Sequence, residues 1–136
     1  MTNEKKILII EDDSLLQEFY KILFRKLKMS FEILEDGEEI ITQIADGKIC
    51  LIIMDINLRN TYLDSKKIDG AQLSKYIKEK FFNLNIPILL VTAYSPNVCG
   101  DDLLVQSKAD DLILKPIINY DSFIDKVRRL LKIDKG

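Results

Sequence analysis

The sequence predicts a single α/β domain in which a parallel β-sheet is covered by helices on both faces. Short, nearly continuous apolar runs rich in β-branched residues recur along the chain, a pattern typical of strands buried on both faces. Between them, apolar residues recur every three or four positions, as in amphipathic helices. Five strands alternating with five helices indicate a parallel sheet, and a reversal of winding direction makes the domain doubly wound. A chain of 136 residues with 47% hydrophobic composition is long enough for one domain with a sizeable core.

The first half of the chain supplies three of these strands and two helices. Ser14 is a candidate N-cap for a helix whose apolar stripe comprises Leu16, Phe19, Leu23 and Leu27. The second helix is expected from about Gly37 or Glu38 to Ala45, with Gly47 as its stop signal. Strands are expected at residues 7–10, 31–34 and 49–54.

The second half repeats the alternation after a polar interruption. Residues 59–68 are charged and have no convincing period, so we expect a long loop there. Pro87 stands at the entrance of a strand, where its missing N–H is tolerated. A weaker helix, flanked by Pro96 and Gly100, carries Leu103, Leu104 and Val105. Strands are expected at residues 86–91 and 112–114, and helices at residues 70–82, 97–107 and 121–132.

Composition excludes several classes of function. The 20 Lys and Arg residues balance 22 Asp and Glu residues, so the formal charge of −2 gives no basic footprint for direct binding to nucleic acid. The 2 cysteines, Cys50 and Cys99, suit free thiols in a reducing compartment. Residues 1–6 form no apolar leader and no run approaches the length of a membrane span. We therefore expect a soluble, cytoplasmic chain without a membrane partner.

The chain contains no histidine. This removes the commonest general base and the commonest metal ligand. Any catalysis must then use carboxylates, hydroxyls, lysine or a bound metal.

Acidic, amide, hydroxyl and lysine side chains follow the ends of the predicted strands. Because the carboxyl ends of parallel strands open onto one edge, we expect these residues to converge there. Crowded carboxylates repel each other unless a cation holds them, and hard oxygen ligands suit Mg²⁺. A lysine and a hydroxyl at the same edge can hold phosphoryl oxygens, and an aspartate there can act as a nucleophile. The residues are Glu11 and Asp12, Asp55 and Asn57, Thr92, and Lys115.

Each of these residues alone has an ordinary structural explanation. Asp55 could begin a turn, Glu11 and Asp12 could cap a helix, and Thr92 and Lys115 could be a turn residue and a solvated surface lysine. The prediction rests on their joint appearance, each at the end of a strand.

Four segments in order resemble the successive motifs of response-regulator receiver domains: residues 9–13, 53–58, 91–93 and 114–116. The resemblance covers nearly the whole chain. It implies one receiver domain over residues 1–136, with a core at about 5–133, and a flavodoxin-like (βα)5 sandwich with strand order 2-1-3-4-5.

The resemblance also assigns a Mg²⁺ site. Asp12 would bind the ion directly and Glu11 through water. Asp55 would contribute a carboxylate oxygen and Asn57 its backbone carbonyl.

Three further roles concern the phosphoryl group. Asp55 would accept it, Thr92 would bond one of its oxygens and shift towards it on activation, and Lys115 would form a salt bridge to it. The Lys115–Pro116 peptide bond would be cis, an uncommon isomer even before proline.

The implied function is a signalling switch and not an enzyme acting on other molecules. Mg²⁺-dependent self-phosphorylation and autodephosphorylation would be its only chemistry. The donor would be a histidine kinase or a histidine phosphotransfer protein, which fits a chain that has no histidine of its own. We expect the signal to pass to a separate downstream output protein.

Three positions depart from the family pattern. Leu112 stands where an aromatic residue usually couples to the threonine, which puts that relay in doubt. Arg59 replaces a proline, and residues 60–68 delay Asp69 and Gly70, either as a flexible insertion or as a lid that contacts a partner. Lys108 replaces a favoured glycine before residues 109–111, which could distort the exit of the fourth helix.

Three other functions fit the sequence less well. A vestigial receiver that acts as a phosphorylation-independent interaction module is favoured slightly by Leu112 and the extension. A phosphohydrolase of the haloacid-dehalogenase type needs a second acid where Asn57 stands. A flavin site lacks a phosphate loop after the first strand, where Glu11, Asp12 and Asp13 would repel FMN.

Overall fold

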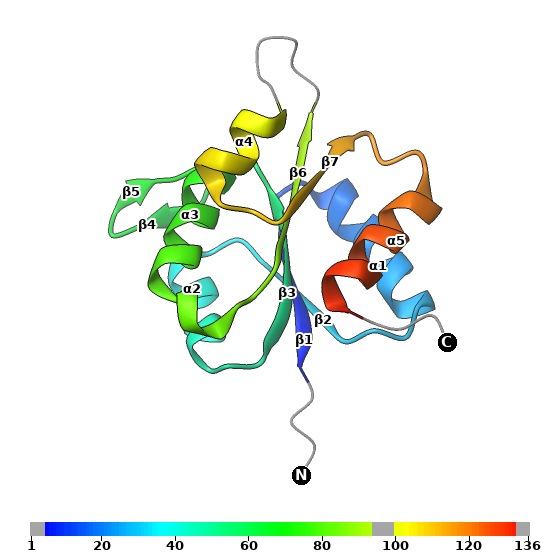
Figure 1. Ribbon diagram of the computed structural model, residues 1–136, viewed down its shortest axis with the longest axis horizontal. Helices are drawn as coiled ribbons and strands as arrows, with labels where there is room; N and C mark the ends of the chain where they lie inside the picture. The colour runs from blue at the N-terminus through cyan, green and yellow to red at the C-terminus, as the bar shows by residue number, and fades with distance from the viewer. Residues whose placement is uncertain (1–4, 94–99, 133–136) are drawn as a thin grey trace.

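A five-stranded parallel sheet forms the centre of the protein, as the computed structural model shows for residues 5–93 and 100–132 (Figure 1). Its strand order is β2-β1-β3-β6-β7. Since β4 and β5 form a separate two-stranded sheet, this is the predicted order 2-1-3-4-5, and the predicted fold class is confirmed. The strands are β1 (Lys6–Ile10), β2 (Phe31–Leu34), β3 (Ile49–Asp55), β6 (Ile88–Ala93) and β7 (Asp111–Lys115).

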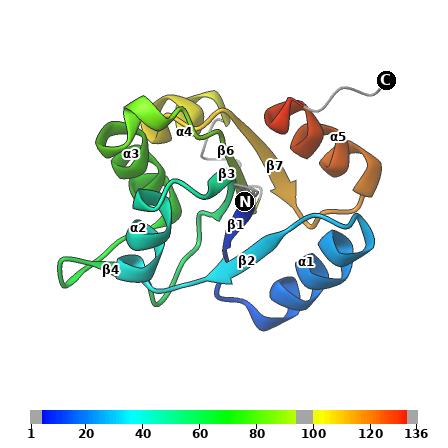
Figure 2. The same cartoon turned by 90° about the horizontal axis from the view of Figure 1, so that it is seen from below.

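Helices cover both faces of this sheet. In the two views α1 and α5 lie on one side, and α2, α3 and α4 lie on the other (Figures 1 and 2). The helices are α1 (Ser14–Lys26), α2 (Gly37–Ala45), α3 (Gly70–Lys80), α4 (Gly100–Ser107) and α5 (Tyr120–Leu131), with a 3₁₀ turn η1 (Phe82–Leu84) after α3.

Alternation along each strand divides the core between the two helical layers. On β1, Ile7 and Ile9 pack in the cluster with α1 and α5, whereas Leu8 and Ile10 pack with α2 and α3. Successive side chains of a strand point to opposite faces, so a strand buried on both faces must be apolar throughout. The continuous apolar runs therefore predicted the strands well, within about two residues at each end.

The first helix differs from its prediction in two respects. Asp13, and not Ser14, is the N-cap, because its carboxylate accepts a 2.9 Å hydrogen bond from the Leu15 N–H. Its fully buried residues are Tyr20 and Phe24, and the predicted stripe of Leu16, Phe19, Leu23 and Leu27 lies partly buried beside them. The helix is thus rotated on the sheet relative to the predicted stripe.

The predicted loop at residues 59–68 instead contains a β-hairpin, formed by β4 (Tyr62–Leu63) and β5 (Lys66–Lys67). Asp64 and Ser65 make its turn with positive φ values of 52° and 67°. Such a turn usually contains glycine or asparagine, so the sequence signal was weak.

This hairpin is docked onto the domain, which argues against a flexible insertion. The buried hydroxyl of Thr61 donates a 2.9 Å hydrogen bond to the carbonyl of Glu35. The backbone of Tyr62 packs so closely against Gly37 that a Cβ there would lie 2.0 Å from the Tyr62 carbonyl oxygen. Gly37 is therefore required for this contact, in addition to starting α2.

The region around α4 has two unexpected features. Val105 is 78% exposed and does not pack in the core. Lys108 has a φ of 58°, so the position directly after α4 needs the left-handed conformation that glycine adopts most easily, and here a lysine adopts it. The predicted helix start at Asn97, with Pro96 and Cys99, lies outside the described residues.

Within residues 5–93 and 100–132, no helix is both long enough and apolar enough to cross a membrane.

Candidate functional site

Three strands bring the predicted residues together at one edge of the sheet. Glu11 directly follows β1, Asp55 is the last residue of β3, and Lys115 is the last residue of β7. By strand alternation, Glu11 continues the row of Ile7 and Ile9, and Asp55 continues that of Leu51 and Ile53. Both carboxylates therefore point to the side of the sheet covered by α1 and α5.

Lys115 forms the central ion pair of the site. Its Nζ lies 2.8 Å from Oδ1 of Asp55, a residue 60 positions away in the sequence, and 3.8 Å from Oε1 of Glu11. The side chains of Asp55 and Glu11 are 3% and 1% exposed, so this ammonium neutralises charge in a poorly solvated place. The predicted convergence of Lys115 on Asp55 is observed.

Asp12 completes an acidic cluster. One carboxylate oxygen from each of Glu11, Asp12 and Asp55 lies within 4.8 Å of the others. Oδ2 of Asp12 accepts a 2.7 Å hydrogen bond from the N–H of Arg59, and Oε2 of Glu11 accepts a 3.1 Å bond from the N–H of Asp13. These backbone donors orient the carboxylates without neutralising them.

The crowding has a clear effect on Glu11. Burial, followed by the close approach and negative charge of the Asp55 carboxylate, raises the pKa of Glu11 from 4.5 to about 8. The N–H of Asp13 and the charge of Lys115 act in the opposite direction but do not compensate. At neutral pH the metal-free site therefore holds a proton on Glu11.

The donor set suits a small divalent cation. Its ligand atoms are hard carboxylate oxygens, and Oε1 of Glu11 is buried without a hydrogen-bond partner. Three carboxylates face one ammonium, so a cation would relieve the remaining repulsion. The residues present thus fit Mg²⁺.

Two predicted site residues remain: Asn57 contacts Asp55, whereas the Thr92 hydroxyl bonds within its own strand. Asn57 lines the pocket, and its N–H donates a 3.2 Å hydrogen bond to Oδ1 of Asp55. Thr92 lies in β6, one position beyond the pairing of Val91 with Asp55, and its hydroxyl donates to the carbonyl of Ala93 at 3.2 Å. The structure brings Asn57 to the acceptor but leaves the predicted role of Thr92 as a prediction.

Sequence reasoning missed several residues of this pocket, which measures about 490 Å³. Arg59 and Asn60 follow β3 by only four and five positions, so their proximity to the strand end was a usable signal. The residues that were not assigned to the site but line it are Asp13, Arg59, Asn60 and Ala93.

Gly70 fixes the backbone beneath the acceptor. A Cβ at this position would lie 2.0 Å from the carbonyl oxygen of Asp55 and 2.7 Å from Cα of Ile56. The Gly70 N–H also donates a 2.9 Å hydrogen bond to the carbonyl of Ile56. The start of α3 therefore packs directly on the end of β3, and only glycine allows this approach.

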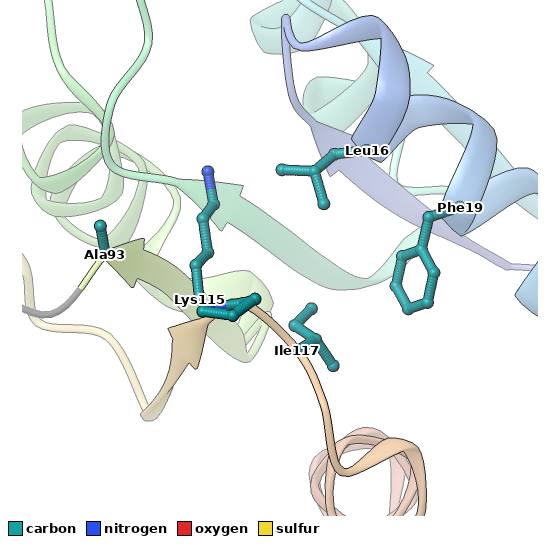
Figure 3. A pocket seen from close by; sticks show the side chains of 6 residues that line it. Leu16, Phe19, Ala93, Lys115 and Ile117 are labelled. Carbon is teal, nitrogen blue, oxygen red and sulfur yellow. The ribbon is translucent and has the colours of Figure 1, made fainter.

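An apolar pocket of about 470 Å³ adjoins the acidic one, and Ala93 and Lys115 line both. Figure 3 shows Leu16 and Phe19 reaching into it from α1, opposite Ile117, while Lys115 extends between them and Ala93. The acidic pocket thus has an apolar neighbour at the surface.

The cis peptide bond expected between Lys115 and Pro116 is present. Residues 7–128 match the response regulator receiver domain family. This chain belongs to that family. The strand-end acids and lysine described above remain the candidate site of this domain.

Known receiver proteins are similar over most of the chain. The transcriptional regulatory protein ResD of Bacillus subtilis is 26% identical over 118 residues, which is 85% of this chain and 43% of ResD. The chain therefore spans less than half the length of that relative.

Solved structures agree with the fold. The Francisella response regulator 1452 receiver domain has a TM-score of 0.76 and 24% identity, covering 95% of this chain and 98% of that one. The response regulator TrrA of Thermotoga maritima, solved in complex with Mg²⁺ and BeF, has a TM-score of 0.73 and 27% identity, covering 93% and 98%.

Proposed function

We propose that this receiver domain is a phosphoacceptor of a two-component phosphorelay, in which Asp55 takes a phosphoryl group from a phosphohistidine on a partner protein. The observation that carries the proposal is the 2.8 Å contact of the Lys115 ammonium with Asp55, inside a cluster of three carboxylates. The partner would be a histidine kinase or a histidine phosphotransfer protein.

The hydrogen bonds of Asp55 indicate which oxygen reacts. Lys115 Nζ and the N–H of Asn57 both donate to Oδ1, which leaves Oδ2 to attack phosphorus. The new O–P bond forms as the P–N bond of the donor breaks, and its electron pair stays on the imidazole nitrogen, which takes up a proton. The product is an acyl phosphate on Asp55.

Reversal of the signal needs only water. Attack of water on phosphorus would break the bond to Asp55, regenerate the carboxylate and release inorganic phosphate and a proton. We propose no activity on other substrates, so the domain is a switch and not an enzyme in the usual sense.

Glu11, Asp12, Asp55 and the backbone carbonyl of Asn57 would hold Mg²⁺. When bound, the ion supplies positive charge that offsets the negative charge of the phosphoryl oxygens in the transition state. The Mg²⁺ of the TrrA complex supports this assignment by similarity. Lys115 would then exchange its contact with the Asp55 carboxylate for one with the phosphoryl group.

The surface beside the site supports docking of a protein donor. Leu15 and Ile118 are 80% and 83% exposed, and their neighbours Leu16 and Ile117 line the apolar pocket next to Lys115. Exposed apolar groups of this kind mark protein-binding surfaces. We propose that the protein carrying the phosphohistidine docks here, in the cytoplasm, and that the domain with its charge of −2 binds no nucleic acid itself.

Phosphorylation by acetyl phosphate with Mg²⁺ tests the acceptor assignment. We expect the wild type to be labelled and Asp55→Asn not to be. Asp64→Asn is the matched control, because Asp64 lies in the exposed turn of the hairpin at a φ of 52°, which asparagine tolerates. Equal labelling of Asp55→Asn and the wild type would eliminate Asp55 as the acceptor.

A docking variant separates the protein donor from the small one. Ile118→Asp should slow transfer from a phosphorylated kinase but leave labelling by acetyl phosphate unchanged, since a small donor needs no docking surface. Slowing of both reactions to the same extent would show that the substitution damages the site itself.

The second candidate is a vestigial receiver that binds partners independently of phosphorylation. The observation that favours it is Leu112, which is half-buried against the core where an aromatic relay residue is usual in the family. A site that fails to bind Mg²⁺ at millimolar concentration and is not labelled would support this alternative.

A further inference from the structure

Tyr20 is a tyrosine buried in the layer between the sheet and helices α1 and α5. It is 1% exposed and packs in the cluster that contains Ile9, Ile53 and Val91. Its ring contacts Phe24 and Phe123 at centroid distances of 6.4 and 6.2 Å. These contacts fix the ring, and a phenylalanine would make them equally well.

Packing does not explain the hydroxyl group of Tyr20. Among the residues that the structure describes, two buried side-chain oxygens have no hydrogen-bond partner: the Tyr20 hydroxyl, and Oε1 of Glu11, which lies 3.8 Å from the Lys115 ammonium. Native proteins rarely leave such groups unpaired, because the lost hydration is not replaced. Both orphaned atoms belong to the same region of the fold.

Strand alternation places Glu11 at the end of the row of β1 residues that packs in the cluster with this tyrosine. Ile9 packs in the cluster with Tyr20, and Glu11 lies two residues further along the same face. Ile53 and Asp55 have the same relation on β3. The two acids therefore lie at the end of the apolar layer in which Tyr20 is embedded.

Electrostatics agree with this placement. Burial raises the pKa of the Tyr20 hydroxyl, and the negative charges of Glu11 and then Asp55 raise it further. The Tyr20 hydroxyl therefore keeps its proton and can donate a hydrogen bond, and the negative charges of both carboxylates act on it.

We propose that Tyr20 is a positioning residue of the phosphoacceptor site, whose unpaired hydroxyl is linked to the unpaired Oε1 of Glu11 through one bridging water. This link would hold the Glu11 carboxylate in the orientation that a divalent cation requires. The inference rests on the proposed function of the site as a Mg²⁺-dependent acceptor.

The choice of tyrosine over phenylalanine then has a functional reason. The ring contacts do not need the hydroxyl, and burying it is unfavourable unless it gains a partner, which the proposed link to Glu11 supplies. Partners that orient metal ligands typically contribute 10- to 100-fold to metal affinity. Tyr20→Phe is therefore expected to weaken Mg²⁺ binding by roughly tenfold without lowering the stability of the metal-free protein.

The experiment compares Tyr20→Phe with Tyr120→Phe, which removes a hydroxyl from a residue that is 53% exposed. The dissociation constant for Mg²⁺ is measured by calorimetry, and the unfolding midpoint is measured in urea with EDTA. A double-mutant cycle with Glu11→Gln shows whether the effect passes through Glu11.

If the inference holds, Tyr20→Phe binds Mg²⁺ more weakly than the wild type, and Tyr120→Phe does not. The unfolding midpoint of Tyr20→Phe is unchanged or higher. In the Glu11→Gln background, Tyr20→Phe causes no further loss of Mg²⁺ affinity. Equal Mg²⁺ affinity of the wild type and Tyr20→Phe overturns it, as does an equal loss in the Glu11→Gln background. A wild type that binds no Mg²⁺ would instead refute the proposed function.

A second measurement does not depend on the folding of a variant at this position. In wild-type protein with ¹³C-labelled tyrosine, the Cζ resonance of Tyr20 should shift as Mg²⁺ binds, because the Glu11 carboxylate to which its hydroxyl is linked is reoriented by the ion. A Tyr20 resonance that does not move while Mg²⁺ saturates the site contradicts the inference.

Discussion

The raised pKa of Glu11 predicts that the metal-free protein loses stability as the pH rises from 5.5 to 8. Folded Glu11 keeps its proton up to about pH 8, whereas an unfolded glutamate releases it near 4.5. Between these values folding takes up a proton, so raising the pH disfavours the folded state. The stabilisation is complete below the lower value and is lost as the pH approaches the upper one.

The expected loss of stability follows from the one proton that Glu11 takes up on folding. Each pH unit in this interval lowers the free energy of unfolding by at most about 1.4 kcal/mol, or about 3 kcal/mol between pH 5.5 and 8. Local opening that admits water or solvent cations to the carboxylates reduces this value, so we expect about 1.5–3 kcal/mol. The absence of histidine from the chain removes the usual competing titration in this range.

Urea unfolding in EDTA at several pH values, followed by circular dichroism, measures the slope. Glu11→Gln is the control, since a neutral amide replaces the acid that titrates, and it should lose less than about 1 kcal/mol over the same range. Millimolar Mg²⁺ should flatten the wild-type slope, because the ion favours the ionised carboxylate. A wild-type stability that is constant or rises from pH 5.5 to 8, or the same slope in Glu11→Gln, refutes the reasoning.

Three further predictions concern close contacts of the backbone and of Lys115. Gly70→Ala should destabilise the domain by about 2–4 kcal/mol in urea unfolding and slow labelling by acetyl phosphate, because its Cβ would displace the backbone of Asp55, 2.0 Å away. Gly37→Ala should undock the hairpin by displacing Tyr62, and hydrogen exchange should then accelerate in residues 61–68 while the central sheet stays protected. Lys115→Met should bind Mg²⁺ several-fold more tightly, since an ammonium 2.8 Å from Asp55 no longer repels the ion, but it should be labelled more slowly.

Neighbouring substitutions serve as controls for these variants. Glu38→Ala, at an exposed position beside Gly37, tests whether any effect comes from the sequence of α2 itself. Lys66→Met removes an exposed lysine of the hairpin and should leave Mg²⁺ affinity unchanged. Unaltered hairpin exchange in Gly37→Ala, or weaker Mg²⁺ binding in Lys115→Met, would contradict the corresponding contact argument.

Much of the fold was predictable because it depends on short-range patterns. A strand buried on both faces must be apolar along its length, and the run ending at Asp55 satisfies this condition without reference to any other part of the chain. The meeting of Asp55 and Lys115 followed as well, since parallel strands share a carboxyl edge. Caps were harder to place, because Asp13 and Ser14 are equally good N-cap residues.

The hairpin was not predictable on the same grounds. Its strands contain two residues each, too few for a period, and Asp64 and Ser65 are unusual residues for its turn. What holds it in place is the close approach of Tyr62 to Gly37 and the bond from Thr61 to Glu35. Neither contact has a signature in the local sequence.

The sequence by itself therefore determined the strands, their common edge and the set of acids and lysine that meets there, because alternation and strand direction are properties of each segment. The tertiary structure alone decided which face of α1 lies on the sheet, and so buried Tyr20 in the cluster with Ile9 and Ile53. It also decided that the N–H of Arg59 would hold Asp12, 47 residues away. Both depend on how separate layers and loops pack against each other, and packing of this kind is set by the shape of the whole core.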